Sequence, residues 1–330
     1  MLFTPAIIAL FAGSLMTAGL LVGAALYGMQ ILRHWDLRSG SELQLKLERQ
    51  TYLISTFVAY AFAFELISMF LFIYTADSLH GFLVGAMCAA GSLNANQWGY
   101  PAIILRIVNF LLAGVWLIVN YTDNQGYDYP LIRMKYFLLL IIAPLILAET
   151  FVQANYFFGL EPEVITSCCG ALFSAKAGNV TADIISFPPR TMEIAFFATM
   201  LLLSALGIVN YRTGKAGYVF AVTAFLAFLI AVASFISFIS IYIYELPTHH
   251  CPFCVLQQEY GCIGYPLFLA LLGGAQAGMG VGILTPYRET GSLKGIVPGI
   301  RKKLILFSLI CYAAFTVTII YKIIFSNLKM

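Results

Sequence analysis

Long runs of apolar residues, each near the length of a membrane span, recur along the whole chain. A helix needs about 20 predominantly apolar residues to cross the hydrocarbon of a bilayer. We expect spans at approximately Pro5–Leu32, Thr51–Thr75, Pro101–Asn120, Lys135–Phe158, Thr191–Tyr211, Tyr218–Tyr244, Ile263–Leu284 and Leu304–Phe325. The runs are apolar throughout, whereas a porin-type barrel would show short alternating segments. The pattern therefore predicts an all-α, polytopic membrane protein with about eight transmembrane helices.

The composition supports this class. Hydrophobic residues make up 61% of the 330 positions and charged residues 10%, whereas a soluble domain carries about 25% charged residues. The net charge of +3 is small and scattered, so we expect no nucleic-acid partner. The connections between spans are short, so residues 1–330 are predicted to form a single transmembrane domain in contact with membrane lipid.

The distribution of Lys and Arg predicts the orientation. Basic residues favour cytoplasmic loops, and most of the 18 Lys and Arg residues fall in one set of alternate loops. Both termini are therefore predicted to lie outside, together with the longer loops 76–100, 159–190 and 245–262. We expect a bacterial cytoplasmic (inner) membrane, with these loops facing the periplasm. Residues Ser41–Gln50 alternate apolar and charged positions, and form either an interfacial segment or an extension of the second span.

Five of the seven cysteines fall inside the three outer loops and Cys262 lies at the outer end of the seventh span, which predicts a cysteine-rich outer cap. The five are Cys88, Cys168, Cys169, Cys251 and Cys254. Cys251 and Cys254 form a C-x-x-C pair, and Cys168 and Cys169 are adjacent. The other two, Cys262 and Cys311, fit the role of small apolar fillers.

Three kinds of chemistry suit this arrangement. The outer cysteines can form structural disulfides in an oxidising compartment, or a redox-active dithiol. Alternatively, their thiolates can hold zinc or an iron–sulfur cluster. His249 and His250 directly precede the C-x-x-C and can supply protons or ligate a metal. The candidate metal ligands are Cys88, Cys168, Cys169, Cys251, Cys254, His249 and His250.

The segment from His250 to Glu259 (HCPFCVLQQE) resembles the C-x-x-C region of quinone-linked disulfide-forming membrane proteins of the DsbB type, and of the related vitamin K epoxide reductases. This resemblance implies that Cys251 and Cys254 pass electrons to a membrane quinone. Cys168 and Cys169, with Cys88, would then relay electrons to or from a periplasmic thiol or redox protein. The chain departs from the DsbB pattern at Gln258, where that pattern carries an arginine.

The order of the cysteines is similar to a second family. Cys88, then Cys168-Cys169-Gly170, then Cys251-x-x-Cys254 follows the C…CCG…CxxC series of CCG-domain iron–sulfur proteins. This resemblance implies an iron–sulfur cluster held by thiolates of the three outer loops. A chain of that kind would serve as a membrane subunit of a larger electron-transfer complex.

Ionisable and amide side chains also lie inside the predicted spans. Such groups are costly in hydrocarbon and often functional. The candidates for a shared polar cavity are Glu65, Arg106, Asn109, Glu149 and Gln153. The cavity would hold a quinone headgroup or conduct protons. Alternatively, Arg106 pairs with Glu65 or Glu149 and only pins helices together.

These observations lead to three hypotheses about function. The first is a membrane thiol/disulfide oxidoreductase on the periplasmic face, with a quinone as its cofactor. The second is a metal- or cluster-bearing membrane subunit that works with other membrane subunits. The third is a transporter or structural subunit whose outer loops are stapled by disulfides. A b-type cytochrome is not expected, because none of the four histidines lies in a predicted span.

Overall fold

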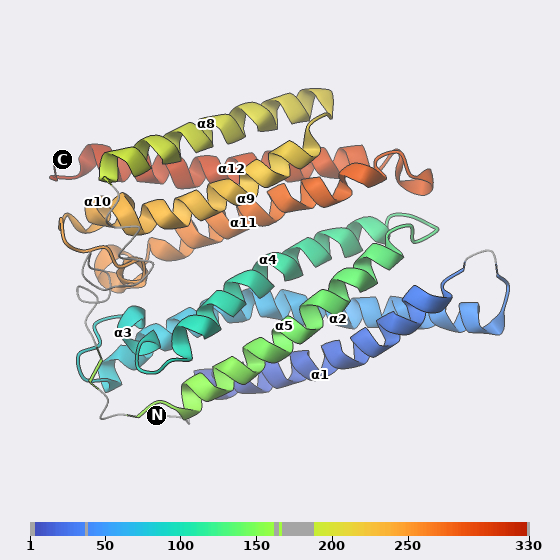
Figure 1. The fold of residues 1–330 in the computed structure, drawn as a ribbon, viewed down its shortest axis with the longest axis horizontal. Coiled ribbons are helices and arrows are strands. Elements are labelled where there is room, and N and C mark those ends of the chain that lie inside the picture. Colours follow the sequence, from blue (N-terminus) through green and yellow to red (C-terminus); the bar gives the residue numbers. More distant parts are fainter. Residues whose placement is uncertain (1–3, 37–38, 162–164, 167–187, 329–330) are drawn as a thin grey trace. The chain divides into compact units, whose positions relative to one another are not determined.

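A computed structural model describes residues 4–36, 39–161, 165–166 and 188–328 (Figure 1). Cys168 and Cys169 lie outside the described residues, together with most of the second predicted outer loop. The structural statements that follow concern the described part of the chain.

Within these residues, eight helices are long and apolar enough to cross a membrane, which confirms the predicted all-α polytopic class. They are α1 (Pro5–His34), α2 (Glu42–Ser78), α4 (Gly99–Asp123), α5 (Ile132–Phe158), α8 (Pro189–Thr213), α9 (Gly217–Ser234) continued by η2 (Phe235–Ile239) and α10 (Ser240–Tyr244), α11 (Gly264–Leu284) and α12 (Val297–Phe325). Each predicted span corresponds to one of these helices. The orientation of the termini stays a prediction.

The largest difference from the predicted boundaries is at the start of α2. The helix begins at Glu42 rather than Thr51, so the segment Ser41–Gln50 extends the second span. Ser41 stabilises this start, because its hydroxyl accepts a hydrogen bond of 3.3 Å from the backbone N–H of Gln44. A serine at this position satisfies one of the N–H groups that the first helical turn leaves without an intrahelical partner.

The chain folds into two compact units. The first unit comprises Met1–Thr75, Asn96–Leu160 and Pro286–Ile300, and the second comprises Ala76–Ala95, Glu161–Thr285 and Arg301–Met330. The first contains α1, α4, α5 and most of α2, and the second contains α8 to α11 and most of α12 (Figure 1). The sequence pattern did not predict this division.

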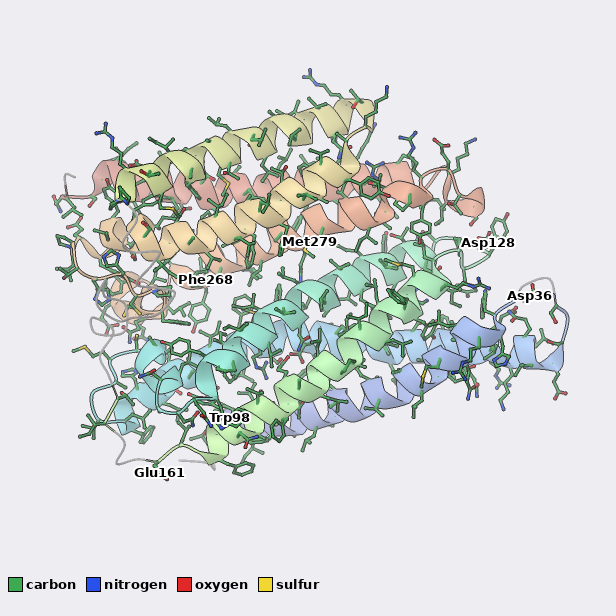
Figure 2. All side chains as sticks on the ribbon, viewed as in Figure 1. Asp36, Trp98, Asp128, Glu161, Phe268 and Met279 are labelled. Carbon is green, nitrogen blue, oxygen red and sulfur yellow. The ribbon has the colours of Figure 1, made fainter. Side chains whose placement is uncertain are left out.

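Aromatic side chains and a buried ion pair hold the first unit together. Helix α5 packs against both α1 and α4. Trp98, labelled in Figure 2, meets Phe151 edge-on with 5.9 Å between the ring centroids. At the other end of α4, the Asp123 carboxylate lies 2.7 Å from the Lys135 ammonium, and both side chains are buried. This ion pair spans the connection from α4 to α5.

Small residues allow the helices of the second unit to approach closely. Helix α9 packs against α8 and α11. A Cβ atom built on Gly278 of α11 would lie 2.3 Å from the Cβ of Ala224 on α9, and one on Gly282 would lie 2.5 Å from that of Ala221. Glycine at such positions gives membrane helices the close backbone contact that stabilises them in lipid.

Candidate thiol site

The second unit holds Cys88 between the end of α2 at Ser78 and the start of the short helix α3 (Ala89–Leu93). Cys88 directly precedes this helix and is fully buried. The Asp77 carboxylate, on the last turn of α2, accepts a hydrogen bond of 3.0 Å from the backbone N–H of Ala89. The Gln257 side chain donates a 2.8 Å hydrogen bond to the carbonyl of Met87. Two polar side chains distant in sequence therefore fix the turn that presents the Cys88 thiol.

The C-x-x-C loop is fixed to the helix that precedes it. The Tyr244 hydroxyl, at the end of α10, donates a 2.7 Å hydrogen bond to the carbonyl of Cys251. His250 Nδ1 lies 2.9 Å from the carbonyl of Ile236, in the π-helical segment η2. A carbonyl can only accept, so Nδ1 must carry the proton. Cys254 then begins the 3₁₀ helix η3 (Cys254–Leu256).

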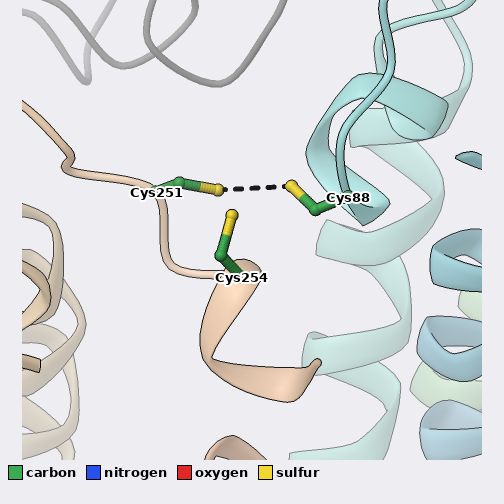
Figure 3. A group of neighbouring side chains, drawn as sticks. All are labelled: Cys88, Cys251 and Cys254. Atoms are coloured by element: carbon green, nitrogen blue, oxygen red, sulfur yellow. Dashed lines mark hydrogen bonds between the residues drawn. The ribbon is translucent and has the colours of Figure 1, made fainter. Parts of the chain in front are cut away.

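These two segments bring three thiols together (Figure 3). The Sγ atoms of Cys88, Cys251 and Cys254, hereafter the cysteine triad, all lie within 4.8 Å of one another, and all three residues are buried. The Sγ atoms of Cys88 and Cys251 are 3.6 Å apart, whereas a disulfide bond is about 2.05 Å long. The two sulfurs therefore do not form a disulfide, and one thiol donates a hydrogen bond to the other.

His249 contacts the triad through Cys254. Its Nε2 atom lies 3.3 Å from the Cys254 Sγ, and its ring packs edge-on against Tyr244 with 4.6 Å between the centroids. Burial lowers the pKa of His249; the nearby Cys88 thiol opposes this shift and His250 adds to it. The imidazole is therefore neutral at pH 7, with a lone pair that can accept a thiol proton or bind a metal.

Two separations within the site are close to those between ligands of one metal ion. With Zn–S bonds of about 2.3 Å and Zn–N bonds of about 2.0–2.1 Å in a tetrahedron, two sulfurs stand about 3.8 Å apart and a sulfur and a nitrogen about 3.5 Å apart. The observed contacts are 3.6 Å between Cys88 and Cys251 sulfurs and 3.3 Å between Cys254 sulfur and His249 nitrogen. An iron–sulfur cluster binds thiolates through several iron atoms, so its ligands spread more widely.

The polar side chains predicted inside the spans also come together, within the first unit. Arg106 Nη2 lies 3.2 Å from Glu149 Oε1, and Arg106 Nη1 lies 3.8 Å from Glu65 Oε1. Asn109 donates a 2.6 Å hydrogen bond to Glu149, and Gln153 Oε1 accepts one from Arg106. Arg106 thus pairs with both carboxyl groups, and whether the pairing serves only to pin the helices stays a prediction. The quinone predicted here stays a prediction.

Sequence reasoning missed the residues that support these two sites. Asp77, Gln257 and Tyr244 hold the cysteine loops, but each is a single polar residue near a span end, with no spacing to distinguish it. Ser14 of α1 accepts a 3.2 Å hydrogen bond from Gln153, and serine is common in membrane helices. Cys311 is half-buried, and its Cβ atom lies 3.2 Å from a Cβ built on Gly274.

Comparison of the chain with protein-family models, with curated proteins and with solved structures gave no match. Neither resemblance noted in the sequence is therefore tested. The fold and the site define the class: an integral membrane protein whose described residues contain eight membrane-length helices and a buried cysteine triad.

Proposed function

We propose that this chain is a membrane protein that binds one thiophilic metal ion, Cu(I) or Zn(II), through the thiolates of Cys88, Cys251 and Cys254. The observation that carries this proposal is the convergence of three buried sulfurs within 4.8 Å. Thiolate ligands select Cu(I), zinc and iron–sulfur clusters over harder ions. The spacing of the triad favours a single ion over a cluster.

Burial of the cysteine triad favours metal binding over reactions that need a solvent-accessible thiol. Reactive cysteines lie in partly exposed, electropositive surroundings, whereas Cys88 and Cys251 are 0% exposed and Cys254 is 5% exposed. Buried thiolates are costly unless a cation compensates their charge. A bound metal ion supplies that cation and shields the sulfurs from oxidation.

The number of ligands distinguishes the two metals. Structural zinc is almost always four-coordinate, so zinc would recruit a fourth ligand, for which His249 beside Cys254 is the candidate. Cu(I) would bind the three thiolates alone. His249→Ala should therefore weaken zinc binding strongly and Cu(I) binding little.

The surroundings of the site follow from the distribution of basic residues. We place the triad on the periplasmic face of a bacterial inner membrane, opposite the loops rich in Lys and Arg. On this proposal the chain supplies the metal to, or receives it from, other membrane subunits or a periplasmic protein. Cys168 and Cys169, in the same predicted set of loops, would add two thiolates to the route by which the metal reaches or leaves the triad.

Metal titration of the detergent-purified, reduced protein tests the proposal. We expect one Cu(I) or Zn(II) per chain, held against a chromophoric chelator. Cys88→Ser, Cys251→Ser and Cys254→Ser should each abolish this binding. Cys311→Ser, which changes a cysteine outside the triad, is the matched control and should bind as the wild type does. Equal metal affinity in all four variants would overturn the proposal.

A second candidate function is thiol/disulfide exchange, which the contact between His249 and Cys254 favours. The imidazole would accept the Cys254 proton, as in other histidine-activated cysteines. Oxidation of Cys251 and Cys254 to a disulfide would release two protons and two electrons, and a membrane quinone would take both to become a quinol. The Cys88 thiolate, in contact with the Cys251 sulfur, would then displace Cys254 and form a Cys88–Cys251 disulfide.

Thiol counting separates this candidate from metal binding. If exchange operates, an added quinone should consume two thiols per chain in the metal-free wild type and produce quinol. The same treatment of Cys254→Ser should produce none. Loss of thiols without quinol formation would show air oxidation and contradict the quinone-linked reaction.

A further inference from the structure

A second group of buried polar side chains lies in the first unit, independent of the cysteine triad. Four helices contribute to it, and its members are nearly or fully buried. They are Ser14 of α1, Glu65 and Ser68 of α2, Arg106 and Asn109 of α4, and Glu149 and Gln153 of α5. Of these, only Glu65, Arg106 and Glu149 can carry charge.

The charges in this group do not balance if both carboxyl groups are ionised. One guanidinium would then face two carboxylates and leave a net negative charge inside the membrane. A buried uncompensated charge is so costly that a carboxyl group takes up a proton instead. Apart from Arg106, the side chains of the group that face the two carboxyl groups are neutral. They are Ser14 of α1, Ser68 of α2, Asn109 of α4 and Gln153 of α5. The group therefore supplies no second cation.

The hydrogen bonds identify which carboxyl group is ionised. Glu149 accepts a 2.6 Å hydrogen bond from Asn109 and lies 3.2 Å from an Arg106 nitrogen. Glu65 is 3.8 Å from the nearest Arg106 nitrogen, and its Oε1 has no hydrogen-bond partner. The donors of the group are thus directed at Glu149 rather than at Glu65.

Both carboxyl groups face the same guanidinium, which can compensate only one negative charge. A protonated carboxyl group is neutral, so one proton on the pair leaves a single carboxylate beside Arg106. We propose that Glu65 and Glu149 form a proton-binding site inside the membrane-spanning part of the first unit, with the proton held on Glu65 and with Glu149 ionised. Arg106 compensates the single remaining negative charge.

Infrared spectroscopy of the protein in lipid nanodiscs tests this site. A protonated carboxyl group has a C=O stretching band that a carboxylate lacks, and the band shifts in D₂O. We expect this band in the wild type at pH 7. Glu65→Gln should remove it because the proton carrier is gone. Glu149→Gln should also remove it, because Glu65 then becomes the sole partner of Arg106 and ionises.

Glu289→Gln is the matched control. Glu289 is 70% exposed and pairs with Arg288 at 2.8 Å, and this interaction lowers its pKa, so it contributes no protonated band at pH 7. The band should be unchanged in that variant. Absence of the band from the wild type, which requires no variant to fold, would overturn the proposal. Persistence of the band at full intensity in Glu65→Gln would also overturn it.

Discussion

The buried ion pair between Asp123 and Lys135 should contribute far more to stability than a surface pair of the same length. The Asp123 Oδ2 atom lies 2.7 Å from Lys135 Nζ, with both side chains at most 1% exposed. The other carboxylate oxygen accepts a 2.8 Å hydrogen bond from the backbone N–H of Leu131. Asp123→Asn keeps an oxygen for Leu131 but removes the charge that compensates the ammonium.

The expected cost follows from that uncompensated charge. Removing one partner of a buried ion pair typically costs about 3–5 kcal/mol, because the other charge stays buried. At 1.36 kcal/mol per factor of ten, the folded-to-unfolded ratio falls roughly 150- to 5,000-fold. The double variant Asp123→Asn with Lys135→Met carries neither charge, so we expect it to recover most of this loss.

Unfolding in mixed micelles with increasing SDS measures the effect. Trp116 is a convenient fluorescent probe, because its indole N–H donates a 3.0 Å hydrogen bond to the carbonyl of Lys135. The control is Glu289→Gln, which breaks an ion pair of nearly equal length, 2.8 Å, at the surface. Exposed pairs contribute little because water and salt screen them, so the control should unfold as the wild type does.

Two results would refute this reasoning. If Asp123→Asn shifts the unfolding midpoint no more than Glu289→Gln does, burial does not strengthen the pair. If the double variant is less stable than either single variant, the charges are not the source of the loss.

Three further predictions concern helix packing and the triad. Gly278→Ala should lower the free energy of unfolding by about 1–3 kcal/mol through overpacking, because the new Cβ would lie 2.3 Å from the Cβ of Ala224. Gly273→Ala is the control and should be neutral, because its new Cβ would lie 3.5 Å from the nearest neighbouring atom. Equal SDS unfolding midpoints for the two variants would contradict the packing. Asp77→Ala should weaken metal affinity about 10- to 100-fold, as changes beside metal ligands do, because it removes the oxygen that accepts the hydrogen bond from the N–H of Ala89; unchanged chelator competition would contradict that role. Metal affinity should fall as pH falls, because thiols must lose protons to bind; an affinity independent of pH would exclude thiolate ligation.

The helices could be predicted because lipid imposes a simple requirement on the sequence. Each predicted span has its helix, and most boundaries agree within three residues. The exceptions are the starts of α2 and α12. The residues that lengthen these helices, such as Lys46 and Arg301, are charged, so apolar content does not reveal them.

The cysteine triad could be anticipated only in part. Counting the predicted spans puts Cys88 on the same side of the membrane as Cys251 and Cys254. The approach of Cys88 to Cys251 and Cys254 depends on the turn held by Asp77 and Gln257, which the sequence pattern does not reveal. His250, a predicted metal ligand, donates its Nδ1–H to the carbonyl of Ile236. That contact arises from the π-helical turn, which also has no signature in the hydrophobic pattern.

The two-unit organisation lies beyond what hydrophobic patterning can predict. All-round apolar helices show that a segment crosses the membrane, but not which neighbour it contacts. Those contacts depend on details such as the close approach of Gly278 to Ala224 and the convergence of carboxyl groups on Arg106.

X-ray absorption at the metal edge of the purified, Cu(I)- or Zn(II)-loaded protein tests metal binding by the triad most directly. We predict one ion per chain surrounded by three sulfurs at about 2.3 Å. In Cys88→Ser, Cys251→Ser and Cys254→Ser the sulfur shell should be lost together with the ion. A first shell of oxygen or nitrogen alone, or a sulfur shell that persists in all three variants, would contradict the proposed function.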